Sequence, residues 1–302
     1  MHQIKLILFA IAPILLFSCS STADKITDPI NKKAELHYNQ GTKNLVAAEY
    51  TNALDHLIKA NNLKPNDSEI LNNLGMAYFF KKQNPLAKKY LKKAIAAKAS
   101  NSDAKNNLAS IYFKERAFDK AAKIYKEVLK DLVYRHQYRV YYNLALISLE
   151  NRNTQEALNR LDKAITENDA YCPAHFLKGK LTLKKSHFMQ AYENFLKASK
   201  GVCYKNPEPI YYQGVALKLA MRYELALIKF ENIVSRFPSS KYYTLANTEI
   251  REIKKNYNID KKLSLKEKFK MRYKNNDEDF LKRKELIDFR ENKPKKFNSP
   301  EF

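Results

Sequence analysis

Residues 71–97, LNNLGMAYFFKKQNPLAKKYLKKAIAA, contain the pattern that decides the fold. Gly75 precedes Ala87 by 12 residues, and large apolar side chains lie on both sides of each. The same pairing of a small residue with an alanine recurs five more times, at successive steps of 34, 34, 36, 34 and 35 residues. The six pairs are Gly41 with Ala53, Gly75 with Ala87, Ala109 with Ala121, Ala145 with Ala157, Gly179 with Ala191, and Gly214 with Ala226. A fixed period of this length indicates a repeat architecture.

The spacing has a steric cause. In a helix-turn-helix unit, the two small residues lie where the paired backbones approach closely, and a larger side chain would push the helices apart. Large apolar residues such as Leu74, Tyr78 and Phe195 fill the remaining space. Pro65 and Pro238 mark helix ends. Together these features resemble the tetratricopeptide repeat.

The resemblance implies an all-α fold in which six helix-turn-helix units stack into a right-handed superhelix, an α-solenoid with a concave inner surface. Glycine and proline are scarce, which also favours helix. The expected units are 34–67, 68–101, 102–137, 138–171, 172–206 and 207–240. Residues 241–257, KYYTLANTEIREIKKNY, predict an amphipathic helix that caps the last unit.

The N-terminus has the features of a targeting segment. Residues 1–18 include the apolar run LILFAIAPILL, which is short for a membrane span and is broken by Pro13. We expect a cleaved signal peptide. The Leu-Phe-Ser-Cys sequence ending at Cys19 resembles the lipobox of bacterial lipoproteins, which implies lipidation of Cys19 and a tether over 19–33. Ser20 resembles an outer-membrane address, so the expected location is the periplasmic face of the outer membrane; the alternative is an ordinary secretory signal with a chance cysteine.

The chain is strongly basic, with a formal net charge of +23. Residues 258–302 carry many charges and few apolar residues, and they predict a basic, partly disordered tail. Anionic lipid or peptidoglycan are possible partners of this tail, and a solvated surface is the alternative. Nucleic acid is not expected as a partner, because an exported protein does not meet it.

No catalytic pattern is present in the sequence. The six histidines form no HExxH or i, i+4 pair, and neither GxSxG nor a glycine-rich phosphate loop occurs. We therefore expect neither an enzyme nor a metal site, and no cofactor besides the lipid on Cys19. Cys172 and Cys203 fall at neighbouring ends of one predicted hairpin, which makes a disulfide plausible in an oxidising compartment. Two free thiols are the alternative.

The first helix of each unit is expected to line a peptide-binding groove. Its expected inward residues are Tyr38, Asn39, Asn72, Asn73, Asn106, Asn107, Tyr142, Asn143, Phe176 and Tyr211. Asn39, Asn73, Asn107 and Asn143 occupy the same place in four successive units. Such amides can donate to and accept from an extended peptide backbone. They resemble the asparagine ladders of tetratricopeptide proteins that hold unfolded segments; the alternative is that they merely solvate the groove.

Three features together resemble the PilF/PilW/Tgl family, the pilotins of type IV pilus systems. The first is six repeats directly behind a lipobox. The second is the longer connection 131–137 followed by YRVYYNLAL (138–146), and the third is RFPSS at 236–240. The resemblance implies that the chain binds the secretin subunit and promotes its outer-membrane localisation and multimerisation. Alternatives are an adaptor of another envelope assembly (secretion, gliding or barrel assembly) and a peptidoglycan-associated protein.

Overall fold

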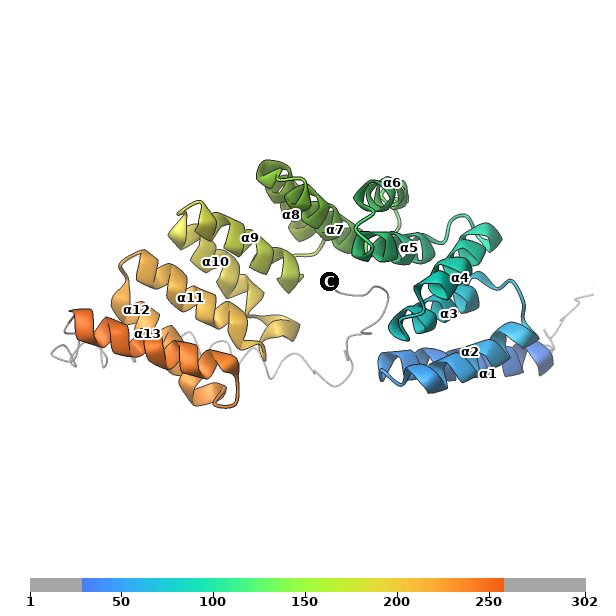
Figure 1. The fold of residues 1–302 in the computed structure, drawn as a ribbon, viewed down its shortest axis with the longest axis horizontal. Helices are drawn as coiled ribbons and strands as arrows, with labels where there is room; N and C mark the ends of the chain where they lie inside the picture. The colour runs from blue at the N-terminus through green and yellow to red at the C-terminus, as the bar shows by residue number, and fades with distance from the viewer. Residues whose placement is uncertain (1–28, 258–302) are drawn as a thin grey trace, which may run out of the picture.

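The computed structural model describes residues 29–257, which form helices and turns with no strand among them. Six helix pairs follow one another along the chain, and a single helix closes the array (Figure 1). The pairs are α1 (Pro29–Val46) and α2 (Tyr50–Leu63), α3 (Ser68–Phe80) and α4 (Asn84–Ala97), α5 (Ser102–Lys114) and α6 (Phe118–Val128), α7 (Gln137–Glu150) and α8 (Thr154–Glu167), α9 (Cys172–Lys184) and α10 (Phe188–Ala198), and α11 (Pro207–Leu219) and α12 (Tyr223–Arg236). The short 3₁₀ helix η1 (Gly201–Cys203) precedes α11, and α13 (Lys241–Tyr257) is the closing helix. The predicted all-α array of six units with a terminal helix is confirmed.

The structure departs from the expected boundaries at two places. α1 begins at Pro29, so residues 29–33 are helical and do not belong to the tether. Proline suits the start of a helix because the first turn leaves backbone N–H groups unpaired in any case. Gln137, expected to end the third unit, is the first residue of α7. The signal peptide (1–18), Cys19 with the rest of the tether up to residue 28, and the tail (258–302) lie outside the described residues.

The paired helices of each unit touch through one small and one large residue. A Cβ atom placed on Gly75 would lie 2.6 Å from Cγ of Leu91 and 3.2 Å from the backbone oxygen of Ala87. At Gly41 the same atom would lie 2.6 Å from Cγ of Leu57. Real carbon contacts are longer, so the helices can approach this closely only because the first helix lacks a side chain there. The small residue therefore sets the distance between the two helices of a unit.

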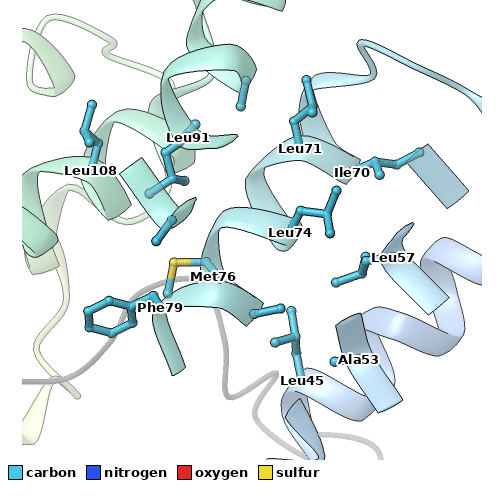
Figure 2. Close-up of a cluster of buried hydrophobic side chains, with 14 of the residues drawn as sticks. Leu45, Ala53, Leu57, Ile70, Leu71, Leu74, Met76, Phe79, Leu91 and Leu108 are labelled. Carbon is cyan, nitrogen blue, oxygen red and sulfur yellow. The ribbon is translucent and has the colours of Figure 1, made fainter. Parts of the chain in front are cut away.

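The hydrophobic core runs continuously from one unit to the next. Figure 2 shows Leu57 of α2, Leu74 of α3 and Leu91 of α4 converging from three helices of the first two units. All three are fully buried. Burying one leucine side chain stabilises a fold by about 1.5–3 kcal/mol. A unit thus completes its core only against its neighbour, as expected of a repeat protein.

Every turn between paired helices contains one non-glycine residue with a left-handed backbone. These six residues each lie seven positions after the small residue of the unit, and they are Ala48, Lys82, Arg116, Arg152, Ser186 and Met221. In the second unit the N–H of Gln83 donates to the backbone oxygen of Tyr78 at 2.9 Å. This bond closes the end of the helix in the manner of a Schellman motif. The regular turn keeps the second helix antiparallel to the first in all six units.

The array is curved, as Figure 1 shows. At the middle of the arch, α6 and α8 lie on the outer side of the bend and α5 and α7 on the inner side. The first helices of neighbouring units also contact each other directly: α1 packs on α3, α3 on α5, and α5 on α7. Side chains on the first helices are therefore brought together along the array.

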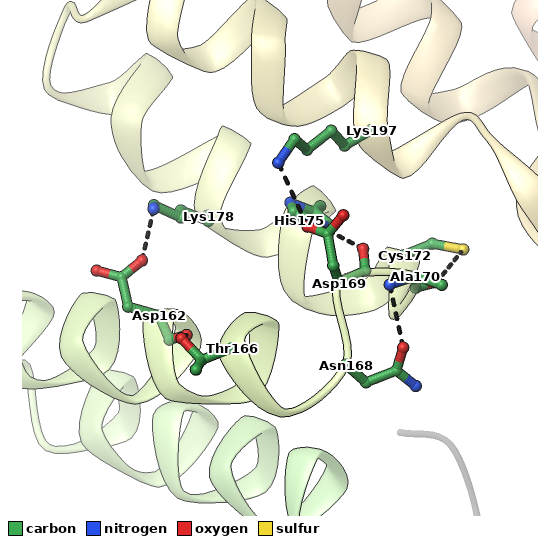
Figure 3. Close-up of polar contacts among 9 residues, drawn as sticks. All are labelled: Asp162, Thr166, Asn168, Asp169, Ala170, Cys172, His175, Lys178 and Lys197. Atoms are coloured by element: carbon green, nitrogen blue, oxygen red, sulfur yellow. Dashed lines mark hydrogen bonds and ion pairs between the residues drawn. The ribbon is translucent and has the colours of Figure 1, made fainter.

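The fifth unit is held by a disulfide at its two ends and by a buried histidine, His175, whose contact with Asp169 is drawn in Figure 3. Cys172 at the start of α9 is bonded to Cys203 in η1, and their Cα atoms lie 6.4 Å apart. The Nε2 atom of the buried His175 lies 2.9 Å from the backbone oxygen of Asp169. Because a carbonyl only accepts, Nε2 carries the proton. The Asp169 carboxylate also pairs with Lys197, at 3.3 Å.

A histidine pair in the first unit predicts a pH-dependent stability. The Nδ1 atoms of His37 and His56 lie 3.0 Å apart between α1 and α2, so only one of them can carry a proton in this contact. Burial and the adjacent His56 lower the pKa of His37, and Lys59 and Lys33 add to the effect. A histidine pKa that is lower in the folded state means that the unfolded chain binds the proton more readily. Stability is therefore lost as the pH falls below about 6.5.

Thermal unfolding between pH 8 and pH 5 tests this prediction. We expect the Tm of the wild type to fall more steeply over this range than that of His37→Asn, whose amide cannot titrate. Parallel pH profiles of the two proteins would show that the histidine pair does not contribute.

Candidate functional site

The predicted groove residues all lie on the first helices of their units. Tyr38 and Asn39 are on α1, Asn72 and Asn73 on α3, Asn106 and Asn107 on α5, Tyr142 and Asn143 on α7, Phe176 on α9, and Tyr211 on α11. Neighbouring first helices contact each other from α1 to α7, and ring contacts of Tyr142 with Tyr171 and of Phe176 with Tyr212 continue the series to α9 and α11. The asparagines and the aromatic residues have different surroundings within it.

Three of the asparagines form a chain of hydrogen bonds across the first three units. Asn107 Nδ2 donates to Asn72 Oδ1 at 2.9 Å, and Asn72 Nδ2 donates to Asn73 Oδ1 at 3.1 Å. Asn73 Nδ2 in turn donates to Thr42 Oγ1 at 2.8 Å. The chain therefore joins α5 to α3 and α3 to α1. Each amide is used to hold neighbouring units together.

The remaining asparagines are largely enclosed as well. Asn106 and Asn107 are fully buried. Asn143 is also buried and lies near the hydroxyl of Tyr125, which is 2.9 Å from Ser110 Oγ. Only Asn39 is exposed. These contacts correct the expectation of an open amide ladder. In the curved array, the asparagine position on each first helix faces the next first helix. Amides buried there bond with other groups of the protein and not with a bound peptide.

Aromatic side chains dominate the first helices in the second half of the array. We call these side chains, together with Tyr242 of the closing helix α13, the aromatic stripe; it consists of Tyr138, Tyr142, Phe176, Tyr211, Tyr212 and Tyr242. All are partly exposed except Tyr242, which is buried. Ring contacts link the units, since the Phe176 and Tyr212 centroids are 5.6 Å apart and those of Tyr211 and Tyr242 are 5.4 Å apart. Such rings offer apolar area at little cost in side-chain entropy.

Tyr211 illustrates how the stripe is fixed. Burial, together with the nearby Glu249 carboxylate, raises the pKa of Tyr211 to about 12. The hydroxyl therefore keeps its proton at neutral pH, and it donates to Glu249 Oε1 on α13 at 3.2 Å. Lys218 also pairs with Glu249, at 2.6 Å. The closing helix thus positions the last part of the stripe.

Lys180 places a positive charge within the aromatic stripe. Its Nζ atom lies 5.4 Å from the Phe176 ring centroid and 5.5 Å from that of Tyr212. Within residues 29–257, no carboxylate forms an ion pair with it. An exposed ammonium over two rings can form an ion pair with a carboxylate of a partner, while apolar groups of the same partner cover the rings. The sequence did not single out Lys180, because lysine is abundant and only the fold brings α9 and α11 together.

Neither metal chemistry nor a membrane span is indicated within the described part of the chain. Residues 29–257 contain no group of three or more histidine, cysteine, aspartate or glutamate side chains that could hold a metal ion. None of the helices in this range is long and apolar enough to cross a membrane. What the first helices present is a surface of rings and a lysine, which suits non-covalent contact.

The repeat geometry defines a tetratricopeptide-repeat α-solenoid, and the comparisons with known proteins agree. Residues 72–132 match the family model described as tetratricopeptide repeat. The fold of residues 29–257 resembles those of PilF and PilW. No protein with curated annotation matches the sequence.

Three solved structures show the extent of the likeness. Pseudomonas aeruginosa PilF has a TM-score of 0.63 and 18% identity, covering 74% of this chain and 100% of that one. PilW, described as a widely conserved type IV pilus biogenesis factor, has a TM-score of 0.60 and 14% identity, covering 70% of this chain and 97% of its own. A chain of the APC/C hetero-tetramer Cut9–Hcn1 has a TM-score of 0.59 and 10% identity, covering 74% of this chain and 43% of that one.

The asparagine chain predicts a clear difference between two substitutions. Asn72→Ala removes both the acceptor for Asn107 and the donor to Asn73, and it leaves a buried amide without a partner. We expect a loss of about 1–3 kcal/mol in unfolding free energy. Asn39→Ala, at an exposed asparagine on α1 of the first unit, should change it by less than about 0.5 kcal/mol. Urea unfolding followed by circular dichroism measures both, and equal effects would contradict the assigned role of Asn72.

Proposed function

We propose that this chain is a lipid-anchored scaffold of the bacterial envelope that binds a protein partner along its first helices and acts as a pilotin. The partner would be the subunit of the type IV pilus secretin. In this role the protein brings the subunit to the outer membrane and promotes its multimerisation. The proposal rests on two features of the chain: the sequence around Cys19 that resembles a lipobox, and the six-unit array.

The observation that carries the proposal is the extent of the array. The whole PilF chain and 97% of PilW are covered by this fold. PilW is described as a type IV pilus biogenesis factor, which supports a role of the same kind here. The longer connection before α7 and the segment that follows it add to the likeness in sequence.

The binding surface follows from the chemistry of the first helices. The half-buried rings of the aromatic stripe supply apolar contact, and Lys180 supplies a charge for a partner carboxylate. The asparagines already bond each other, so they keep the units in register instead of reading a peptide. Recognition is therefore expected to centre on α7, α9 and α11. No catalytic step is proposed.

Deletion of the gene tests the proposed role. We expect secretin multimers to disappear from outer-membrane fractions on non-reducing, unheated gels, and the chain with Cys19→Ser to restore them poorly because it lacks the anchor. Normal multimer levels in the deletion strain would contradict the pilotin role. In that case, salt-sensitive co-sedimentation with purified sacculi would indicate peptidoglycan binding instead.

Charge reversal at Lys180 tests the binding surface. The Lys180→Glu variant should bind the purified secretin subunit about 10-fold more weakly, because it repels the partner carboxylate and exposes the rings to water. Lys163→Glu is the matched control: its Nζ atom lies 5.7 Å from the Tyr141 ring centroid, but it belongs to α8 on the outer side of the arch. Affinities measured by isothermal titration calorimetry should be unchanged in this control. Equal losses of affinity in the two variants, or no loss in either, would exclude the aromatic stripe as the binding surface.

A further inference from the structure

Two connections between units are longer than the others. Residues 129–136 join α6 to α7, and residues 199–206 join α10 to α11, while the other connections between units have four residues each. The starts of α7, α9 and α11 adjoin one another. The Tyr138 ring near the start of α7 lies 4.8 Å from the Tyr171 ring just before α9, and Cys172 at the start of α9 is bonded to Cys203 in the connection before α11. Because the helices repeat in the same direction, their starting ends share one edge of the array. Both long connections therefore project from the same edge.

Each long connection exposes apolar side chains. Leu132 and Val133 are each 87% exposed, Val202 is 72% exposed and Tyr204 48%. Single exposed apolar residues are common on protein surfaces. Here an adjacent pair on one connection is matched by a second pair on the other. We call these four residues the apolar edge.

The connections are held in place, so the exposure is not the result of a loosely packed loop. In the first connection, Asp131 accepts from Ser102 Oγ at 2.6 Å, and its backbone oxygen accepts from Gln137 Nε2 at 2.8 Å. Tyr134 donates to Asp103 Oδ1 at 2.9 Å. The second connection is fixed by the disulfide between Cys172 and Cys203. Polar groups therefore anchor each connection while its apolar side chains point outward.

Exposed basic side chains flank the apolar edge. They are Arg135 on the first connection and Lys200 and Lys205 on the second. The carboxylates of Asp131 and Asp103 accept hydrogen bonds from Ser102 and Tyr134, and Asp169 pairs with Lys197, so these acidic groups are directed toward partners within the fold. A partner at this edge therefore meets apolar side chains together with three exposed cations.

We propose that the apolar edge docks on an anionic phospholipid surface. The apolar side chains would enter the boundary between headgroups and acyl chains, and the flanking Arg and Lys residues would contact phosphate groups. A membrane fits better than a protein, because the tips are narrow and lie on two separate connections. A stable protein interface needs a contiguous patch of about 800 Å² per partner. This contact is independent of the acyl chains expected on Cys19 and would orient the array on the membrane.

A single tryptophan tests the proposal, because the natural chain contains none. Val133→Trp and Val202→Trp are made separately in the chain from residue 19 onward carrying Cys19→Ser, which lacks the apolar segment 1–18 and cannot be acylated. Leu36→Trp on α1 is the matched control, since Leu36 is 67% exposed but lies far along the array. Vesicles of phosphatidylethanolamine and phosphatidylglycerol should shift the emission of the first two variants to the blue, and brominated lipids should quench it. Leu36→Trp and pure phosphatidylcholine vesicles should show neither effect.

A second variant distinguishes insertion of the apolar side chains into the bilayer from binding of the chain through basic residues elsewhere. Replacing both Leu132 and Val133 with serine should lower vesicle affinity at least fivefold, while Leu36→Ser leaves it unchanged. Vesicle binding with no blue shift at positions 133 and 202 would overturn the proposal, since the chain would then bind by charge alone. A blue shift induced by a soluble protein but not by lipid would also overturn it.

Discussion

The contact between a small residue of the first helix and a large residue of the second is the constraint on which the rest of the structure depends. Gly75 lies so close to Leu91 that a Cβ atom on it would be 2.6 Å from Cγ. The contact recurs with Phe195 opposite Gly179 and Phe230 opposite Gly214. It fixes the distance within each pair, and the left-handed residue seven positions later fixes the turn. Ala109 and Ala145 occupy the same place in the third and fourth units and are fully buried, so all six pairs have a small residue there and stack into a curved array (Figure 1).

The curvature decides what the first helices can offer. In the first three units they approach one another closely enough for Asn107, Asn72 and Asn73 to bond in series. In the later units, rings occupy the same region and remain partly exposed, with Lys180 above two of them. The same architecture thus gives one half that is held together by amides and another half that is suited to grip a partner. The proposed binding surface and the apolar edge are made of different residues that adjoin where Tyr138 contacts His136 of the first long connection. Protein bound on the first helices and lipid at the connections would therefore lie next to each other.

The repeat could be predicted from sequence because its cause is local and steric. The 12-residue spacing of Gly75 and Ala87 follows directly from helix pairing, and it located all six units. Whether the asparagine side chains are exposed to a binding partner could not be predicted in this way, because their burial depends on how neighbouring units tilt against each other. Lys180 was missed for a similar reason, since its rings come from two different units. The turn residues Lys82 and Arg116 gave no signal either: their left-handed backbone is imposed by the packed helices and not by glycine or asparagine.

A double-mutant cycle at Gly75 and Leu91 tests the central claim most directly. Unfolding free energies would be measured by urea titration for Gly75→Leu, Leu91→Ala and the double variant. We predict a loss of about 1–3 kcal/mol from overpacking for the first and about 2–5 kcal/mol from a cavity for the second. The double variant should be more stable than the sum of the two losses implies, by at least about 1 kcal/mol, because the new side chain fills the vacated space. Strict additivity would contradict the claim that this contact sets the spacing of the array.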